Sequence, residues 1–203
     1  MDEDFINDGM KALSLIDEDI ALAFDMLGAP APRIRPAGFE TFLSTIVSQQ
    51  ISTEAARAIL GRVKGVLPDE SPQALLMVDD QCLRDAGLSF RKIEYAKGLA
   101  QAVCDGRFDI DGLAKMTDEE AITEITALRG FGRWSAEIYL MFSLNRQDIF
   151  PADDLALQVA LGRLKKLSSK PTPKQARALI AHWAPLRSVG SLFLWHYYRG
   201  APT

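Results

Sequence analysis

The residues best suited to chemistry in this chain lie in two short segments. The first is Gly130-Phe131-Gly132, after which a helix can begin at Arg133, and the second contains the adjacent carboxylates Asp153 and Asp154. Glycine has no Cβ, so a phosphate oxygen can come close to the main chain of such a turn. The helix that follows offers unpaired amides and the positive end of its dipole. The two segments therefore predict a site that holds a phosphate backbone beside a fixed negative charge.

Each segment also has a purely structural interpretation. The glycines could form an ordinary corner between two helices. An Asp at the start of an apolar helix commonly caps it by accepting hydrogen bonds from the amides of the first turn. Either Asp153 or Asp154 could be such a cap, and the structural and chemical roles are compatible if Asp153 caps the helix and Asp154 faces a cleft.

The elements that position these segments are predicted to be helices. Apolar residues recur at helical spacing over residues 39–47. Thr117 and Glu120 form a predicted capping box, and the pairs Ser71-Pro72 and Thr172-Pro173 place a hydroxyl cap before a proline. No segment alternates apolar and polar residues as a half-buried strand would. The pattern predicts an all-α fold of roughly ten helices, with bounds good to a few residues.

The overall charge argues against a protein that holds nucleic acid by bulk electrostatics. Lys and Arg number 23 and Asp and Glu number 27, which gives a net charge of −4. Backbone amides at a helix N-terminus attract phosphate whatever the overall charge. We therefore expect modest non-specific affinity for nucleic acid and a weak dependence of that affinity on salt.

Composition also bears on the compartment and the cofactors. Hydrophobic residues make up 48% and charged residues 25%, as a packed core requires. The sequence contains no apolar run long enough to span a membrane and no recognisable signal peptide, so we expect a cytoplasmic protein. Cys82 and Cys104 are too few for a four-cysteine zinc or iron–sulfur site, and we expect both to be small core residues.

Other polar residues are expected to be structural. His182 and His196 lack the spacing of a metal site. Lys165, Lys166 and Lys170 form a charge cluster that is typical of a solvated face, and the alternative is that they contact backbone phosphates.

The motifs occur in an order that resembles the helix-hairpin-helix (HhH-GPD) DNA glycosylase superfamily, and most closely its 3-methyladenine DNA glycosylase II branch. Gly130–Ala136 matches the hairpin of that branch and Asp153-Asp154 its acidic pair, at the family's separation from Trp134. The similarity extends upstream through Ile46–Ser52. Downstream it takes in Trp183, Arg187-Ser188 and Trp195. The chain resembles the compact form that lacks an N-terminal β-rich domain.

The resemblance implies a fold and an activity. The fold would be a single two-lobed helical module over residues 1–203, with a central lobe of about 38–132 and a second lobe of about 1–37 plus 133–203. DNA would lie in a cleft between the lobes. The activity would be hydrolysis of the N-glycosidic bond of alkylated purines, such as 3-methyladenine and 7-methylguanine, in duplex DNA. The damaged base would first be flipped out of the stack, and its removal would initiate base excision repair.

The resemblance also implies roles for single residues. Asp154 takes the catalytic position. Trp134, Trp195 and Ile138 take the positions that line the base pocket, although a tryptophan on a helix is more often a core residue. The residues expected to bind DNA through the hairpin are Gly130, Phe131, Gly132, Arg133 and Ser135, with Phe131 pointing into the hairpin and holding its two arms together.

Two further features of the family map onto this chain. Gln50 would be the wedge that fills the gap left by the flipped base, with Gln49 behind it. The competing interpretation is a solvated helix end. The main-chain carbonyls of Thr126, Leu128 and Phe131 would hold a Na⁺ or K⁺ ion. No cofactor is otherwise expected, and no iron–sulfur cluster.

Trp134 also bears on the reaction type. Members of the superfamily that nick the strand carry a nucleophilic Lys at this position, so no AP lyase activity is expected here. The partner would be duplex DNA that contains a damaged base. The protein would act as a monomer without a membrane, near the nucleoid in a bacterium or in the nucleus of a eukaryote. The alternative is a non-catalytic helix-hairpin-helix DNA-binding module, against which Asp154 and the two tryptophans argue.

Overall fold

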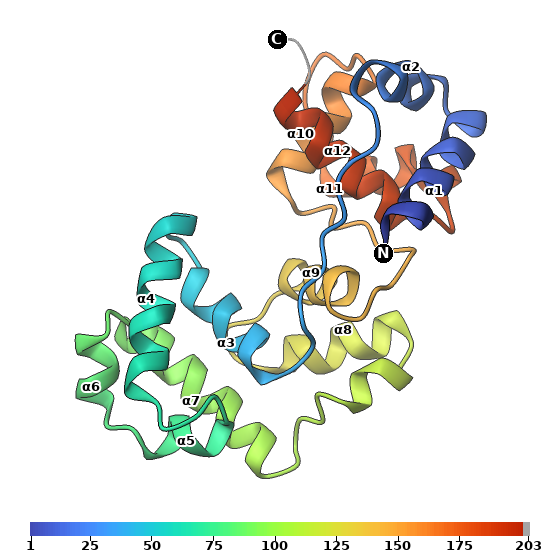
Figure 1. The fold of residues 1–203 in the computed structure, drawn as a ribbon. Coiled ribbons are helices and arrows are strands. Elements are labelled where there is room, and N and C mark those ends of the chain that lie inside the picture. The colour runs from blue at the N-terminus through green and yellow to red at the C-terminus, as the bar shows by residue number, and fades with distance from the viewer. Residues whose placement is uncertain (201–203) are drawn as a thin grey trace. The chain divides into compact units, whose positions relative to one another are not determined.

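A computed structural model describes residues 1–200 of the chain (Figure 1). These residues contain twelve α-helices, two short 3₁₀ helices and no strand, so the all-α prediction is confirmed. The predicted number of helices was low. One reason is that helices such as α6 (Asp80–Asp85) are too short to show a helical period in the sequence.

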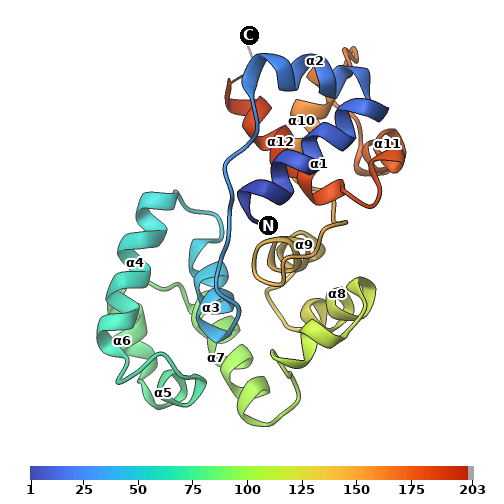
Figure 2. The same cartoon turned by 45° about the vertical axis from the view of Figure 1, so that its right-hand side comes forward.

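The chain forms two compact units, and α9 (Arg133–Phe142) runs from one into the other. Unit 1 comprises Met1–Ile34 and the residues from Glu137 onward, and unit 2 comprises Arg35–Ala136. The helices of each unit can be followed in the second view (Figure 2). No helix within residues 1–200 is long and apolar enough to cross a membrane.

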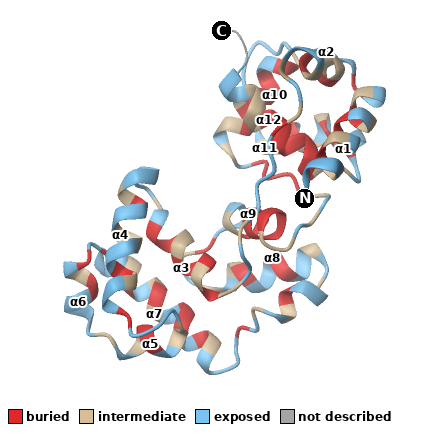
Figure 3. Ribbon diagram, viewed as in Figure 1, coloured by how far each residue is buried: buried red, intermediate tan, exposed pale blue. Residues whose placement is uncertain are grey.

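Unit 2 has α3 (Phe39–Ser48) as its first helix. Its other elements, besides the start of α9, are α4 (Thr53–Val66), α5 (Pro72–Met77), α6, α7 (Phe90–Cys104), a 3₁₀ helix (Gly112–Lys115) and α8 (Asp118–Ala127). The apolar stripe predicted for α3 (Phe39–Ser48) is buried, as Figure 3 shows by colour. Phe42, within that stripe, meets the edges of Phe108 and Phe131 with ring centroids 5.4 Å apart in each case. This aromatic cluster fixes α3 to the segments before α8 and after it.

The predicted helix starts are confirmed where capping residues signalled them. Ser71 accepts from the amide of Ala74 at the start of α5. Thr117 and Glu120 form a complete capping box on α8. Such caps satisfy amides that have no partner within the helix, and they can be recognised from local sequence alone.

Unit 1 has Trp183 at its centre. Besides the end of α9, unit 1 contains α1 (Glu3–Ile16), α2 (Glu18–Leu27), α10 (Leu155–Leu164), α11 (Pro173–Leu179), a 3₁₀ helix (Ala181–Trp183) and α12 (Arg187–Gly200). The ring of Trp183 is fully buried, and its Nε1 donates to Asp17 Oδ2 at 2.7 Å. Asp17 is the N-cap of α2, so this indole connects the centre of the unit to the corner between α1 and α2.

The expectation that Lys165 lies on a solvated face is wrong. Its Nζ lies 2.6 Å from Asp17 Oδ1 and 2.9 Å from Asp19 Oδ2, and its side chain is only 16% exposed. His182 Nε2 lies 3.0 Å from Asp17 Oδ2. The lysine stands 148 residues from its partner Asp17. A charge cluster read from local sequence therefore could not show this pairing.

The expectation that both cysteines are buried is also wrong. Cys82 and Cys104 are free and exposed. Cys82 lies on the short helix α6 and Cys104 is the last residue of α7. An apolar sequence context did not distinguish the outer face or the end of a helix from its buried face.

Candidate active site

Asp154 is the N-cap of α10. Its Oδ1 accepts a hydrogen bond from the amide of Leu157 at 3.0 Å, and its side chain is half-buried. The sequence left open whether Asp153 or Asp154 caps this helix, and the structure shows that the cap is Asp154. Asp153 instead lies with Oδ2 3.6 Å from Nη2 of Arg177. The residue expected to act chemically, Asp154, is therefore also the residue that caps the helix.

An indole also holds the Asp154 carboxylate. Trp195, on α12, donates from Nε1 to Asp154 Oδ1 at 3.2 Å. The Trp195 ring lies against Phe142 with centroids 5.8 Å apart, and the guanidinium of Arg33 stands 4.7 Å from the centroid of the Phe142 ring. Two N–H donors, and an aromatic ring that supports the indole, keep this carboxylate in one orientation.

The loop that leads into Asp154 is held by a residue that we did not predict. Gln158, one turn into α10, is buried and donates from Nε2 to the carbonyl of Ala152 at 2.8 Å. Its Oε1 accepts from Lys170 Nζ at 2.9 Å. The signal in the sequence that could have identified Gln158 is its position as a polar residue on an otherwise apolar helix face.

Leu155 was also missed as a potential contact. It follows Asp154 directly and is 62% exposed, although it is a large apolar side chain at the start of a helix. A leucine exposed beside a candidate catalytic carboxylate suits contact with an apolar part of a bound ligand.

The remaining predicted pocket residues lie in both units. Trp134 and Ile138 are one turn apart on α9, so they project from similar directions of that helix. Trp134, in unit 2, is 42% exposed, whereas Ile138, in unit 1, is buried. Trp195 belongs to unit 1 and is half-buried.

The hairpin turn of unit 2 requires glycine at one of its two glycine positions. Gly130 has a φ of 97°, and a Cβ there would lie 2.5 Å from the ring of Tyr95. Gly132 is exposed, and a Cβ there would meet no atom within 4 Å. The first glycine therefore shapes the turn, while the second leaves open space in front of the N-terminus of α9.

The side chains around this turn fasten it to its neighbours. Phe131 is buried against Phe42 of α3, and that it also holds the two arms of the hairpin together stays a prediction. Arg133 makes two hydrogen bonds to the carboxylate of Glu119 on α8, at 2.6 and 3.2 Å. This pair joins the two arms. Ser135 lies half-buried in the first turn of α9.

The predicted wedge turn is tied to the hairpin. Gln49 donates from Nε2 to the carbonyl of Gly130 at 2.7 Å. Gln50 is exposed and has a φ of 58°, a left-handed conformation that the sequence did not predict. Lys92 donates from Nζ to the carbonyl of Val47 at 2.7 Å, and burial lowers the pKa of this lysine. Gln50 is therefore exposed on a turn that is hydrogen-bonded to the hairpin through Gln49.

The carbonyls predicted to hold a monovalent cation lie at the end of α8 and in the turn that follows it. Thr126 lies in the last turn of α8, where carbonyls have no partner within the helix. The Leu128 carbonyl accepts from the amide of Phe131 at 3.2 Å, and a carbonyl oxygen has a second lone pair. Within residues 1–200, no group of His, Cys, Asp and Glu side chains is arranged to hold a metal.

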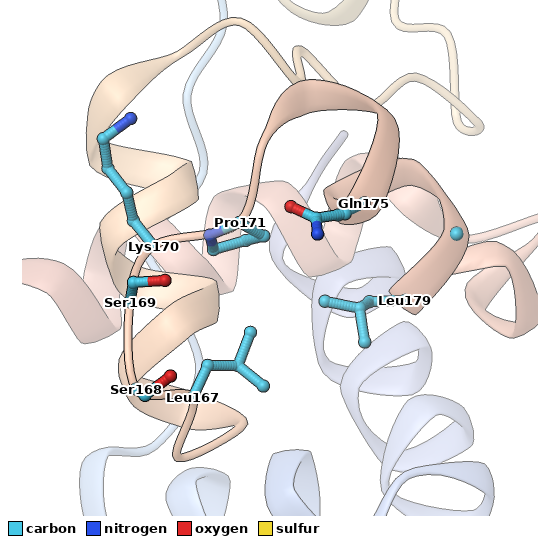
Figure 4. A pocket seen from close by; sticks show the side chains of 8 residues that line it. Leu167, Ser168, Ser169, Lys170, Pro171, Gln175 and Leu179 are labelled. Carbon is cyan, nitrogen blue, oxygen red and sulfur yellow. The ribbon is translucent and has the colours of Figure 1, made fainter.

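Unit 1 holds a pocket beside α11 and another beside Trp195, both within residues 1–200. The first, of about 490 Å³, is lined by the loop between α10 and α11, and Leu167 and Leu179 face one another across it (Figure 4). None of the predicted site residues lines it. The second, of about 390 Å³, includes Trp195 together with Arg33, His196 and Arg199. A basic pocket beside the indole that contacts Asp154 suits a phosphate group of a substrate.

Comparisons with known proteins agree with this geometry. The sequence profile of the HhH-GPD superfamily of base excision DNA repair proteins matches residues 43–185. The chain is 33% identical over 161 residues to DNA-3-methyladenine glycosylase 1 of Schizosaccharomyces pombe, an alignment that covers 77% of this chain and 71% of that protein.

Solved structures give the same result. A 3-methyladenine DNA glycosylase from Schizosaccharomyces pombe in complex with abasic DNA has a TM-score of 0.85 and 29% identity, over 96% of this chain and 98% of that one. A DNA-3-methyladenine glycosidase from Bacillus halodurans has a TM-score of 0.84 and 33% identity, over 95% and 89% of the respective chains.

Proposed function

The chain belongs to the HhH-GPD superfamily of base excision DNA repair proteins, and we propose that it is a monofunctional DNA glycosylase. It hydrolyses the N-glycosidic bond of alkylated purines in duplex DNA and so initiates base excision repair. The observation that carries the proposal is the Asp154 carboxylate, which caps α10 and is held by the Trp195 indole. Relatives whose names specify 3-methyladenine support this choice of substrate.

The chemistry needs little more than a well-placed carboxylate. Alkylation at N3 or N7 gives a purine a positive charge, so the base leaves as a neutral molecule without a strong general acid. Positive charge then develops on the sugar. A preorganised Asp154 carboxylate stabilises that charge, and the same group can orient or deprotonate the attacking water.

We assign recognition of the base to Trp134, Trp195 and Ile138. An electron-poor cationic base is attracted to the face of an indole by stacking and by cation–π interaction. The 42% exposure of Trp134 supports this role, because a tryptophan that only fills a core is usually more buried.

We assign binding of the DNA backbone to the hairpin residues Gly130, Phe131, Gly132, Arg133 and Ser135. The open space at Gly132 before the N-terminus of α9 supports contact with a phosphate. Phe131 acts indirectly by anchoring the turn on Phe42.

Gln50 is the wedge, and Gln49 supports it through its bond to Gly130. A Na⁺ or K⁺ ion on the carbonyls of Thr126, Leu128 and Phe131 would add positive charge for a phosphate.

The remaining assignments follow from this activity. Trp134 stands where a lyase of this superfamily would need a nucleophilic lysine, so the product is an abasic site in an unbroken strand. We propose that the protein works as a monomer in the compartment that holds the DNA. This is the cytoplasm with its nucleoid in a bacterium and the nucleus in a eukaryote.

The deciding experiment measures release of free base from methylated duplex DNA by wild type, Asp154→Asn and Asp153→Asn. Asp153→Asn is a matched control, because it removes the neighbouring carboxylate without changing the cap of α10. We expect wild type and the control to release 3-methyladenine, and Asp154→Asn to release very little.

Other results would change the assignment. Equal release by Asp154→Asn and wild type would move catalysis to another residue. A folded wild type that binds DNA but releases nothing from a panel of alkylated bases would leave the alternative, a non-catalytic DNA-binding module. A covalent adduct trapped by borohydride would contradict the monofunctional assignment.

A further inference from the structure

We propose that Gln158, oriented by Lys170, is a positioning residue for the carboxylate of Asp154. This inference rests on the proposed function for its catalytic consequence. The underlying geometry is a chain of hydrogen bonds that runs from the loop between α10 and α11, through Gln158, to the loop that ends at Asp154.

Gln158 contacts the catalytic loop at two points. Its main-chain amide bonds the carbonyl of Asp154 at 3.0 Å, as the first turn of α10 requires. Its side-chain Nε2 bonds the carbonyl of Ala152 at 2.8 Å. The amide of Asp154 also bonds the carbonyl of Pro151 at 2.9 Å. The residues before the carboxylate are therefore fastened to the helix that it caps.

Lys170 determines which way the Gln158 amide faces. An ammonium group can only donate hydrogen bonds, so Lys170 Nζ at 2.9 Å must face the oxygen of the amide. The NH₂ group then faces the Ala152 carbonyl, which can only accept. Both ends of the amide are satisfied, and a flipped amide would place like groups opposite one another at both ends.

Gly162 allows the lysine to come close enough. It lies one turn beyond Gln158 on α10, and a Cβ there would stand 3.3 Å from Cα of Lys170 and 3.4 Å from Cδ of Pro171. A larger residue would push this stretch of main chain outward. Figure 4 shows the Lys170 side chain pointing away from Leu167 and Leu179, the apolar walls of the 490 Å³ pocket. Lys170 is one of the residues that line this pocket, and its Nζ reaches Gln158 of α10.

The consequence for catalysis concerns the position of a charge. Ala152 is fully buried, so its carbonyl depends on Gln158 for a partner. If that bond is lost, the loop can shift and move the carboxylate away from the sugar. A displacement of about 1 Å at a reacting group can slow a reaction on the order of 100-fold.

The test uses Gln158→Glu and Lys170→Met in the full chain. The glutamate keeps its contact with Lys170 but presents an acceptor to the Ala152 carbonyl. Lys170 is exposed, so Lys170→Met does not threaten folding. Lys174→Met is the matched control, an exposed lysine on α11.

The first readout does not require activity. The chain has three tryptophans, so ¹⁵N-labelled protein gives three indole N–H signals, assigned with single Trp→Phe variants. The signal of Trp195 reports its bond to Asp154, and that of Trp183 reports its bond to Asp17. We expect Gln158→Glu and Lys170→Met to shift the Trp195 signal and leave the Trp183 signal unchanged. Lys174→Met should shift neither signal.

The second readout compares the single-turnover rate of base release with the affinity for abasic DNA. We expect Gln158→Glu to slow release roughly 10-fold to 100-fold with affinity unchanged, and Lys170→Met to slow it less. An unmoved Trp195 signal in both variants would overturn the proposal. The proposal would also be overturned if base release fell only in proportion to the loss of folded protein, as thermal melts measure it. If wild type releases no base while the Trp195 signal shifts, the glycosylase assignment fails and the positioning of Asp154 stands.

Discussion

Unit 1 contains two aspartates with the same local role and different surroundings. Asp17 caps α2 and Asp154 caps α10, each by accepting an amide of the first helical turn. Each also accepts a hydrogen bond from a tryptophan indole, Asp17 from Trp183 at 2.7 Å and Asp154 from Trp195 at 3.2 Å. The Asp17 side chain is 1% exposed, whereas Asp154 is half-buried.

The neighbours of Asp17 make it structural. Burial raises the pKa of Asp17, but hydrogen bonds from Lys165, Trp183 and His182 outweigh burial and lower the pKa to about 2. A buried ion pair leaves this carboxylate no access to a ligand. Asp154 lies instead at an accessible helix start, beside Trp195 and a basic pocket. The comparison teaches that two N-caps, each with an indole partner, can differ in access to a ligand, because the fold buries Asp17 and leaves Asp154 half-buried.

The largest expected effect is on activity, at Asp154. Asp154→Asn should slow base release on the order of 1000-fold, because a neutral amide can neither stabilise positive charge on the sugar nor accept a proton from water. Stability should change little, because Asn caps a helix about as well as Asp. Single-turnover release and urea unfolding measure the two quantities. A large loss of stability would mean that Asp154 resembles Asp17 after all.

The converse is expected at Asp17. Asp17→Asn should lower the free energy of unfolding by about 3 kcal/mol, because it leaves the buried Lys165 charge poorly compensated. Base release per folded molecule should stay at the wild-type rate. Chemical denaturation and an activity assay below the melting temperature test this pair of expectations. Slower release by fully folded Asp17→Asn would break the division between the two aspartates.

Acid should weaken the Asp17 network in a defined window. The folded pKa of about 2 lies below the ordinary value of 3.8, so the carboxylate stabilises the fold fully above 3.8, and this contribution is lost as pH falls through 2. The difference in unfolding free energy between wild type and Asp17→Asn should therefore shrink by about 2 kcal/mol between pH 5 and pH 2. Unfolding curves at a series of pH values measure it. A constant difference would show that the ion pair does not lower this pKa.

The smallest expected effects separate the two indoles. Trp183→Phe removes an N–H donor from a buried carboxylate and should cost about 1–3 kcal/mol of stability. Trp195→Phe keeps an aromatic ring and removes the N–H from the half-buried Asp154, where water can replace it. We expect a several-fold slower base release and little change in melting temperature. Equal losses of stability in the two variants would remove the distinction.

Much of the local structure follows from the sequence. The all-α class, the capping box of α8 and the buried stripe of α3 depend on neighbours within a few positions, so periodicity and cap residues predict them. The glycine turn before α9 is likewise local, since the φ of 97° at Gly130 favours glycine. The resemblance to a family predicted roles for Asp154 and Trp195. The fold brings these two residues together although they are 41 positions apart.

The partners of each side chain were decided only by the tertiary structure. The sequence could not show that Lys165 reaches Asp17, that Phe131 packs on Phe42, or that Lys170 orients Gln158. Nor did it distinguish Asp153 from Asp154 as the cap, because helix bounds are uncertain by more than one residue. The sequence by itself determined where helices begin and which residue types are available for chemistry. Packing between distant segments decided which carboxylate is buried in an ion pair and which is accessible, because burial and charge pairing depend on contacts that local sequence does not specify.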